Sequence, residues 1–234
     1  MGMPGNNLNV ENLAALGHAL ALGHQVDGVN ARQIDLYRQL ATLPAWLART
    51  RRYCESPKAR DIRVADWLLD NDYQVLRALR QLRVDLPKNF YRQLPALQGP
   101  NRPMRLLVIA HGALRAMPKQ LTIGNLVNYV NAYQQTAGLQ IAELWALPSL
   151  LRLASLENLV DAFRQLNAEL AVPFAVSLEA TENRVTEPAD RIAQAISSLA
   201  AVQALEWQDF VDYTSQVERI LRADPVAAYG SMSF

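Results

Sequence analysis

The longest apolar pattern in the chain runs from Leu139 to Phe163, with the sequence LQIAELWALPSLLRLASLENLVDAF. On a helix of about 3.6 residues per turn, this stretch is apolar on nearly every side. A helix that is hydrophobic all round is buried inside a protein, whereas a surface helix keeps one polar face. The pattern therefore predicts a buried central helix, from about 139 to 170, around which the other elements pack.

The rest of the chain also has helical rather than strand-like periodicity. Further helices are expected at about 13–23, 31–42, 44–52, 57–84, 104–117, 123–136, 189–204 and 206–223. Strands alternating with helices, glycine-rich phosphate loops and repeated periods are not found. The sequence thus predicts an all-α protein, an irregular multi-helix bundle of about nine helices around the central one.

Composition changes divide the chain into four parts. Residues 1–12 are rich in glycine, proline and asparagine and are expected to be disordered. A helical core domain should cover 13–171, followed by a linker at 172–188, where the helical pattern breaks. The segment 189–234 is expected to be helical and to pack on the core. It stops on apolar residues without a polar run, as a truncated chain would.

Charge and cysteine content exclude several classes of function. The 234 residues carry a formal net charge of +1, which provides no electrostatic reason to bind nucleic acid. The single cysteine, Cys54, excludes an internal disulfide and a cysteine-based metal cluster. Neither a signal peptide nor a transmembrane pattern is visible. We therefore expect a cytoplasmic chain with no metal and no cofactor.

Polar residues that interrupt apolar helix faces form a candidate network. The members are Asp70, Asn71, His111, Glu143, Arg152 and Glu157. Glu143 and Glu157 lie about 21 Å apart along one helix, which is too far for the carboxylate pair of a glycosidase. Buried carboxylates in helical domains usually meet a cation, and Arg152 is the expected partner. No residue is assigned a catalytic role.

The candidate ligand contacts are aromatic or cationic. They are Phe90, Tyr91, Arg92 and Trp145. The first three lie in a proline-punctuated loop, and loops carry binding residues more often than helices do. Trp145 could stack on a sugar ring, although aromatic residues at helical spacing usually belong to the core.

Several strings in the sequence are similar to one known family. They are VADWLLDNDYQVLRALRQLRVDLPKNFYRQLP (Val64 to Pro95), AHGALRAMPK (Ala110 to Lys119), AYQQTAGLQIAELWALPSLLRLASLENL (Ala132 to Leu159) and the stretch from Ile196 to Phe234. In this order they resemble the N-terminal helical region of cyclic β-1,2-glucan synthases, which are very large bacterial membrane enzymes. The segment 171–188 is shorter than in that family, and the chain stops at SMSF where the family continues.

The resemblance implies a non-catalytic helical domain of a glycosyltransferase that polymerises glucose from UDP-glucose. Such a domain would act as a scaffold or glucan-handling module at the cytoplasmic face of the inner membrane. Its partners would be the remaining domains of the same polypeptide and β-1,2-glucan. In that family the catalytic parts lie further along the polypeptide, and none of their motifs is visible here.

Two other functions are compatible with the residues. The first is a small carbohydrate-active enzyme with Asp70 or Glu143 as general acid, because these charges interrupt apolar faces. About nine helices are too few for a twelve-helix toroid, which counts against this alternative. The second is a helical protein–protein interaction module, in particular a homodimer formed through the apolar end at 229–234.

Overall fold

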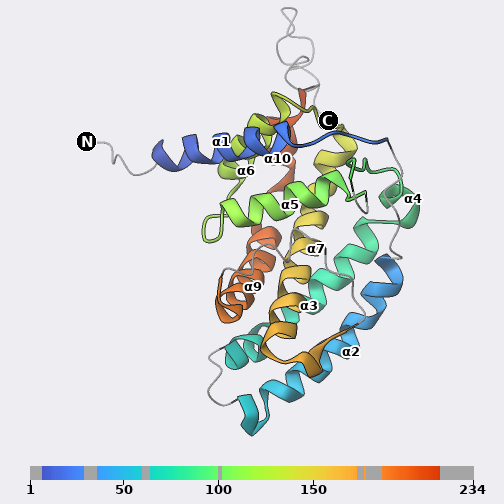
Figure 1. Cartoon of the computed structure of the whole chain (residues 1–234), viewed down its shortest axis with the longest axis vertical. Helices are drawn as coiled ribbons and strands as arrows, with labels where there is room; N and C mark the ends of the chain where they lie inside the picture. The colour runs from blue at the N-terminus through green and yellow to red at the C-terminus, as the bar shows by residue number, and fades with distance from the viewer. Residues whose placement is uncertain are drawn as a thin grey trace, which may run out of the picture.

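The computed structural model describes residues 7–28, 36–59, 64–99, 102–172, 177 and 186–216. Within these ranges the protein is built of helices without a strand, so the all-α prediction is confirmed (Figure 1). The α-helices are α1 (Asn7–Leu22), α2 (Leu36–Cys54), α3 (Val64–Asp85), α4 (Lys88–Tyr91), α5 (Arg105–Ala116), α6 (Ile123–Gln134), α7 (Ile141–Leu166), α9 (Pro188–Ala204) and α10 (Trp207–Thr214). Two short 3-10 turns, η1 (Pro57–Ala59) and η2 (Ala168–Leu170), complete the list. None of the described helices is long and apolar enough to cross a membrane.

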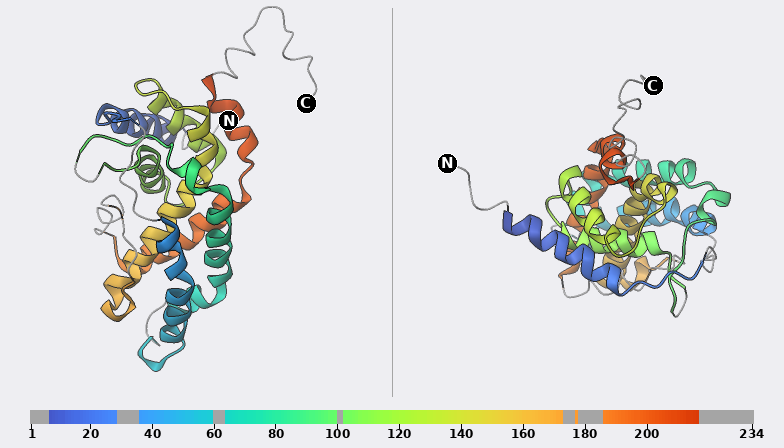
Figure 2. Two further views of the ribbon diagram at one scale, coloured as in Figure 1. Left: turned by 90° about the vertical axis from the view of Figure 1, so that its right-hand side faces the viewer. Right: turned by 90° about the horizontal axis from the view of Figure 1, so that it is seen from above.

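Helix α7 is the central helix that the apolar pattern predicts. It runs through the middle of the bundle, with α3, α5, α9 and α10 packed against it (Figures 1 and 2). Every residue from Ala146 to Phe163 is buried, including those on its polar positions. Pro148 lies inside this run without ending the helix. The all-round hydrophobicity of α7 is therefore explained by neighbours on all its sides.

The N-terminal end of α7 differs from the prediction. Ile141 is 48% exposed and Trp145 is 47% exposed, although the sequence pattern places Trp145 on a buried face. Burial on every side begins only one residue later, at Ala146. The described neighbours cover the middle of the helix and leave one side of its first turns open. Trp145 therefore contributes an accessible aromatic surface instead of a core contact.

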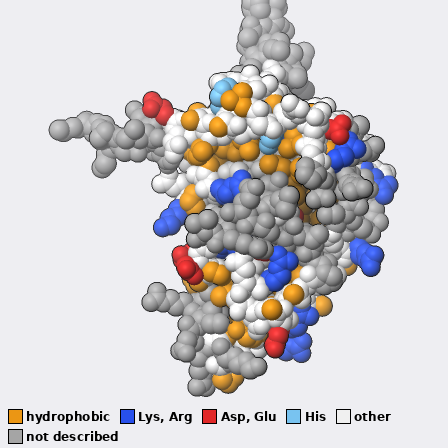
Figure 3. Space-filling view, in the orientation of Figure 1, with side chains coloured by type: hydrophobic (Ala, Val, Ile, Leu, Met, Phe, Trp, Pro, Cys, Tyr) orange, Lys and Arg blue, Asp and Glu red, His pale blue; other side chains and the backbone are white. Residues whose placement is uncertain are grey.

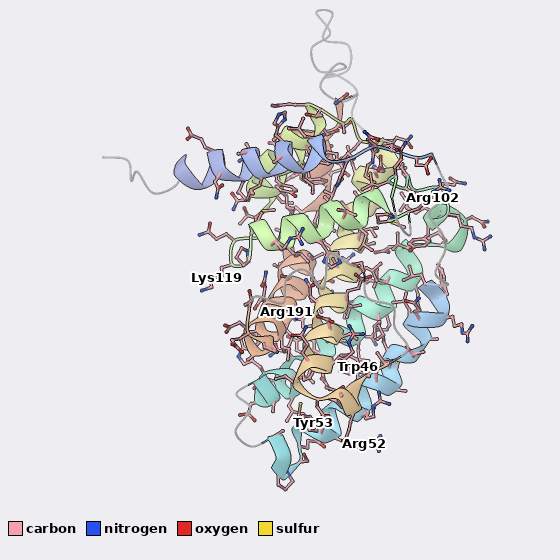
Figure 4. All side chains as sticks on the ribbon, in the orientation of Figure 1. Trp46, Arg52, Tyr53, Arg102, Lys119 and Arg191 are labelled. Carbon is pink, nitrogen blue, oxygen red and sulfur yellow. The ribbon has the colours of Figure 1, made fainter. Side chains whose placement is uncertain are left out.

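The lower half of the bundle is joined by aromatic contacts at the C-terminal end of α7. The Trp46 indole on α2 donates a hydrogen bond of 3.0 Å to the Leu170 carbonyl oxygen in η2, and Figure 4 labels this tryptophan. Its ring also meets the edge of Phe163 at 6.0 Å between centroids. These contacts tie α2 to α7 across a long sequence separation and close the core at this end.

Several helix boundaries differ from the predicted ones. The last helix, expected at 206–223, ends at Thr214, with Ser215 in an extended conformation. The two helices expected at 31–42 and 44–52 are one helix, α2, with Pro44 inside it. Leu40, Leu43 and Leu47 are buried on both sides of the proline, so packing holds the helix together despite the lost hydrogen bond. Helix α1 already begins at Asn7, within the stretch expected to be disordered. Helix α3 begins at Val64, because 57–59 forms a 3-10 turn instead.

The C-terminal helices lie against the rest of the bundle. Helix α9 packs on α7 and α3, and α10 packs on α6 and α7. Most of the predicted linker, 172–188, and the apolar end at 229–234 lie outside the described residues. The domain limits proposed from composition remain predictions.

Helix α1 crosses α6 at a glycine. A Cβ atom added to Gly17 would lie 2.3 Å from the backbone carbonyl oxygen of Tyr129. Because the backbone of α6 cannot move aside as a side chain can, the close crossing requires glycine at this position. Gly124 in α6 offers the opposite case, since nothing lies within 4 Å of its added Cβ.

We expect Gly17→Ala to destabilise the protein and Gly124→Ala to stabilise it. Overpacking at the crossing should cost about 1–3 kcal/mol, whereas an alanine in open helical space should contribute roughly 0.5–1 kcal/mol. Thermal unfolding of the two variants beside the wild type measures both effects. Equal melting temperatures for the two variants would show that α1 does not contact α6 this closely.

Candidate functional site

Helix α7 carries charged side chains inside the core, and each has a partner on another helix. The first is Glu143, which accepts two hydrogen bonds from the Arg105 guanidinium, one of them 2.9 Å from Nε. Glu143 is 0% exposed and Arg105 is 4% exposed. In a bidentate pair of this kind, two guanidinium N–H groups each donate to one carboxylate oxygen. Glu143 also accepts from the Gln140 backbone N–H and thereby caps the start of α7.

The second group joins α7 to α5. Glu157 Oε2 lies 2.8 Å from His111 Nε2, and both side chains are buried. The hydroxyl of Ser177 lies 3.0 Å from the same His111 nitrogen and 2.5 Å from the same Glu157 oxygen. In a serine hydrolase the serine and the acid bond opposite nitrogens of the imidazole. Here both meet Nε2, and the serine also donates directly to the acid, so the arrangement is not that of a serine–histidine–acid triad.

The third group joins α7 to α9. Asp161 accepts a hydrogen bond of 2.9 Å from Arg191 Nη2, and both side chains are 0% exposed. Arg164, one turn further along α7, donates to the other oxygen of Asp161. Figure 4 labels Arg191 on α9 beside the central helix. This pair fixes the position of α9 on α7.

The fourth group is different because its contacts are long. Arg152 Nη1 and the Ser149 hydroxyl each lie 3.4 Å from Asp85 Oδ2 at the end of α3. Burial lowers the pKa of the Arg152 guanidinium; Asp85 raises it, and nearby Arg77 lowers it further. The Arg152 side chain is 6% exposed while that of Asp85 is 42% exposed. The long contact with Asp85 therefore offsets only part of the free-energy cost of burying the Arg152 charge.

The predicted single polar network does not form. Its members fall into separate groups, because Glu143 pairs with Arg105, Glu157 pairs with His111, and Arg152 meets Asp85. Arg152 is buried, as the pattern predicts, but it is the partner of neither α7 glutamate. The 3.6-residue period shows which side chains face inward and not which neighbour each of them meets.

The two members on α3 lie apart from these groups. Asp70 is exposed. The Asn71 amide donates to the Trp67 carbonyl oxygen within its own helix, so it does not reach α7. Asp70 lies outside the apolar stripe of α3, whereas Asn71 lies within that stripe, between the buried Leu68 and Val75, and bonds only its own helix.

Sequence reasoning did not find Asp85, Arg105, Asp161 and Arg191. A signal existed for two of them. Asp161 interrupts the all-round apolar run of α7 in the same way as Glu157. Arg191 shares one helical face with Ala195, Ser198 and Val202, all of which are buried.

The candidate ligand contacts separate into covered and accessible groups. Phe90 and Tyr91 are partly buried against the core. Burial, together with the charge of Glu157, raises the pKa of Tyr91 to about 12, so this hydroxyl stays protonated at neutral pH. Arg92 is exposed and Trp145 is about half exposed. A ligand role for any of the four remains a prediction.

The described residues offer no ready-made metal site. No group of three or more His, Cys, Asp or Glu side chains within them could hold a metal ion. Cys54 is buried, and burial raises the pKa of its thiol to about 11. A thiol with this pKa carries little of the reactive thiolate at neutral pH.

His24 is expected to make folding stability depend on pH. Burial, together with the charge of Arg105, lowers its pKa from 6.5 to about 4, and its Nδ1 lies 2.8 Å from the Tyr133 hydroxyl. Between these two pH values the unfolded chain binds a proton that the folded chain does not, so stability falls as the pH drops through this range. Urea unfolding of wild type and His24→Gln at several pH values should show a weaker dependence in the variant. If the free energies of unfolding of wild type and variant changed equally with pH, His24 would not be the source of the pH dependence.

These observations define an all-α helical domain whose core holds paired charges. The chain is 38% identical over 96 residues to the cyclic β-(1,2)-glucan synthase NdvB of Rhizobium meliloti, a match that covers 41% of this chain and 3% of that protein. Part of the chain is therefore related to a glucan synthase, as the motif strings predict. No protein-family model matches the chain, and no solved structure matches it.

Proposed function

We propose that this chain is a non-catalytic helical domain of a glycosyltransferase related to the cyclic β-1,2-glucan synthases, where it acts as a scaffold or glucan-handling module. The observation that carries this proposal is the 38% identity to NdvB over 96 residues. Because a fold alone does not define a function, the substrate class is proposed from this relationship, and the paired, buried carboxylates support the proposed role. The parent protein would use UDP-glucose and would place this domain at the cytoplasmic face of the inner membrane.

The state of the buried carboxylates supports a non-catalytic role. Glu143 and Asp161 are 0% exposed, and each is bonded to an arginine. A general acid must come within hydrogen-bond reach of the bond that it cleaves. Glu143 would have to leave Arg105 to serve as the general acid of a small carbohydrate-active enzyme. Their geometry is that of groups that hold helices together.

Turnover by the isolated chain tests the proposal. The purified chain is incubated with UDP-glucose, with and without linear β-1,2-glucan, and UDP release and glucan length are measured. We expect neither to change beyond the rates in buffer alone. Turnover that disappears in Glu143→Gln would contradict the proposal and identify the chain as an enzyme.

Exposed apolar side chains favour a second candidate, a protein–protein interaction module. Leu16 is 43% exposed, Leu22 is 67% exposed and Val26 is 44% exposed, all in or just after α1. Figure 3 shows hydrophobic side chains gathered over this part of the molecule. Light scattering over a range of concentrations tests for self-association through this surface. A dimer that Leu22→Glu dissociates would favour a homodimer, and a monomer would leave this surface to the other domains of the polypeptide.

A further inference from the structure

The junction of α3 and α7 has a polar surface with incomplete bonding. Asp85, the last residue of α3, faces Ser149 and Arg152 of α7 at 3.4 Å each. Charge-assisted hydrogen bonds between arginine and carboxylate are usually about 2.7–2.9 Å long. This is the only hydrogen bond of the Arg152 side chain within the described residues. A nearly buried guanidinium thus keeps most of its donors for another acceptor.

A neighbouring amide adds an acceptor without a donor. Gln81 lies one helical turn from both Arg77 and Asp85 on α3, so the three side chains share one side of the helix. The Gln81 Oε1 atom is buried and has no hydrogen-bond partner in the described part of the chain. Buried polar groups are rarely left unpaired, and each exception calls for an explanation. The α3 side of this junction therefore carries an unpaired acceptor one turn before Asp85.

An exposed aromatic ring adjoins these polar groups. Trp145 precedes Ser149 by one turn and Arg152 by two turns, so the three residues share one side of α7. Trp145 is 47% exposed. On the α3 side, Val84 next to Asp85 is 76% exposed. The junction thus combines an accessible indole with a row of hydrogen-bonding groups.

We propose that this α3–α7 seam, formed by Asp85, Trp145, Ser149 and Arg152, binds a segment of β-1,2-glucan chain. The identity of the sugar rests on the proposed function, whereas the site itself rests on the geometry. The apolar face of a glucose ring stacks on the Trp145 indole. Its hydroxyl groups accept hydrogen bonds from Arg152 and donate hydrogen bonds to Asp85.

Charge and hydrogen-bonding capacity favour a neutral sugar over an anion. An anionic ligand at Arg152 would also meet the Asp85 carboxylate, which repels it. A hydroxyl group can both donate and accept, so neighbouring hydroxyls of one ring satisfy the carboxylate and the guanidinium together. Small-molecule sites generally combine an aromatic surface with a few placed polar groups. The seam combines the half-exposed Trp145 indole with the polar groups of Asp85, Ser149 and Arg152.

Calorimetry with linear β-1,2-gluco-oligosaccharides tests the seam, using the full chain. We expect wild type to bind and Trp145→Ala to bind about tenfold more weakly, a change of ~1.4 kcal/mol. Trp67→Ala is the matched control, because Trp67 is 43% exposed on α3 and lies outside the seam. This control should retain wild-type affinity. Asp85→Ala should also weaken binding by about tenfold. Because it also takes the carboxylate from the nearly buried Arg152, its melting temperature is measured beside its affinity.

Three outcomes would overturn the inference. The first is a wild type that does not bind the oligosaccharide, and the second is a Trp145→Ala chain that binds as well as Trp67→Ala. The third is binding of UDP-glucose, titrated separately, without binding of glucan. None of these outcomes involves turnover, so failure of the seam is distinguishable from failure of the proposed function. Melting temperatures of all variants separate lost binding from lost folding.

Discussion

Glu143→Ala is expected to destabilise the protein by about 3–5 kcal/mol, because it leaves the buried Arg105 guanidinium without its carboxylate. Arg105 is only 4% exposed, so water cannot replace the lost acceptor. The variant also loses the hydrogen bond that caps the start of α7. Small domains have total stabilities of only about 5–15 kcal/mol. Urea unfolding followed by circular dichroism should therefore show a much lower midpoint.

A double variant provides the control for this pair. Arg105→Met combined with Glu143→Leu removes both charges and fills the space with apolar atoms. Replacing a buried ion pair in this way is often neutral or stabilising. We expect the double variant to recover most of the stability lost in Glu143→Ala. A Glu143→Ala chain within about 1 kcal/mol of wild type would mean that Arg105 finds water or another acceptor.

Asp161→Ala is expected to release α9 from α7. It removes the carboxylate that holds Arg191, and both groups are completely buried. Removing one partner of a buried ion pair costs about 3–5 kcal/mol. The effect should be local first, because Arg191 lies in the first turn of α9 and this pair connects the two helices. Hydrogen exchange of the α9 amides should therefore accelerate by about a hundredfold, which corresponds to ~2.7 kcal/mol.

Arg164→Ala is the matched control, since Arg164 bonds the other oxygen of the same carboxylate. Its side chain is 34% exposed and the pair spans one helical turn. Exposed pairs of this kind contribute roughly 0.2–1 kcal/mol. Exchange in α9 should stay close to wild type in this variant. Equal effects of Asp161→Ala and Arg164→Ala would show that Arg191 does not anchor α9.

Helix type and burial were largely predictable from the sequence. The pattern of α7 requires burial because no face of it is polar, and Ala146 to Phe163 are indeed buried. Thr122 was recognisable as a helix cap, and its hydroxyl accepts from the Asn125 backbone N–H. The fusion of two predicted helices into α2 was not predictable, because Pro44 alone favours a break. Packing of the leucines around Pro44 decided the outcome.

The hydrophobic periodicity of the sequence could not predict which residues pair with the buried charges. The pattern placed Glu143, Arg152 and Glu157 inside, which is correct. It could not show that Arg105, Asp85 and His111 would meet them, since these residues come from α5 and the end of α3. Likewise it placed Trp145 inside, although no described helix covers that side of α7.

The sequence by itself determined the all-α class, the buried central helix and the need to neutralise charges within it. It did so because local propensity and hydrophobic period act along the chain, where neighbours are known. The tertiary structure alone decided which cation meets which carboxylate, and that Arg152 and Trp145 lie at an incompletely bonded surface. Such pairings depend on how helices that are far apart in the sequence cross. A small change in the position of one helix decides whether two opposite charges come within hydrogen-bond distance.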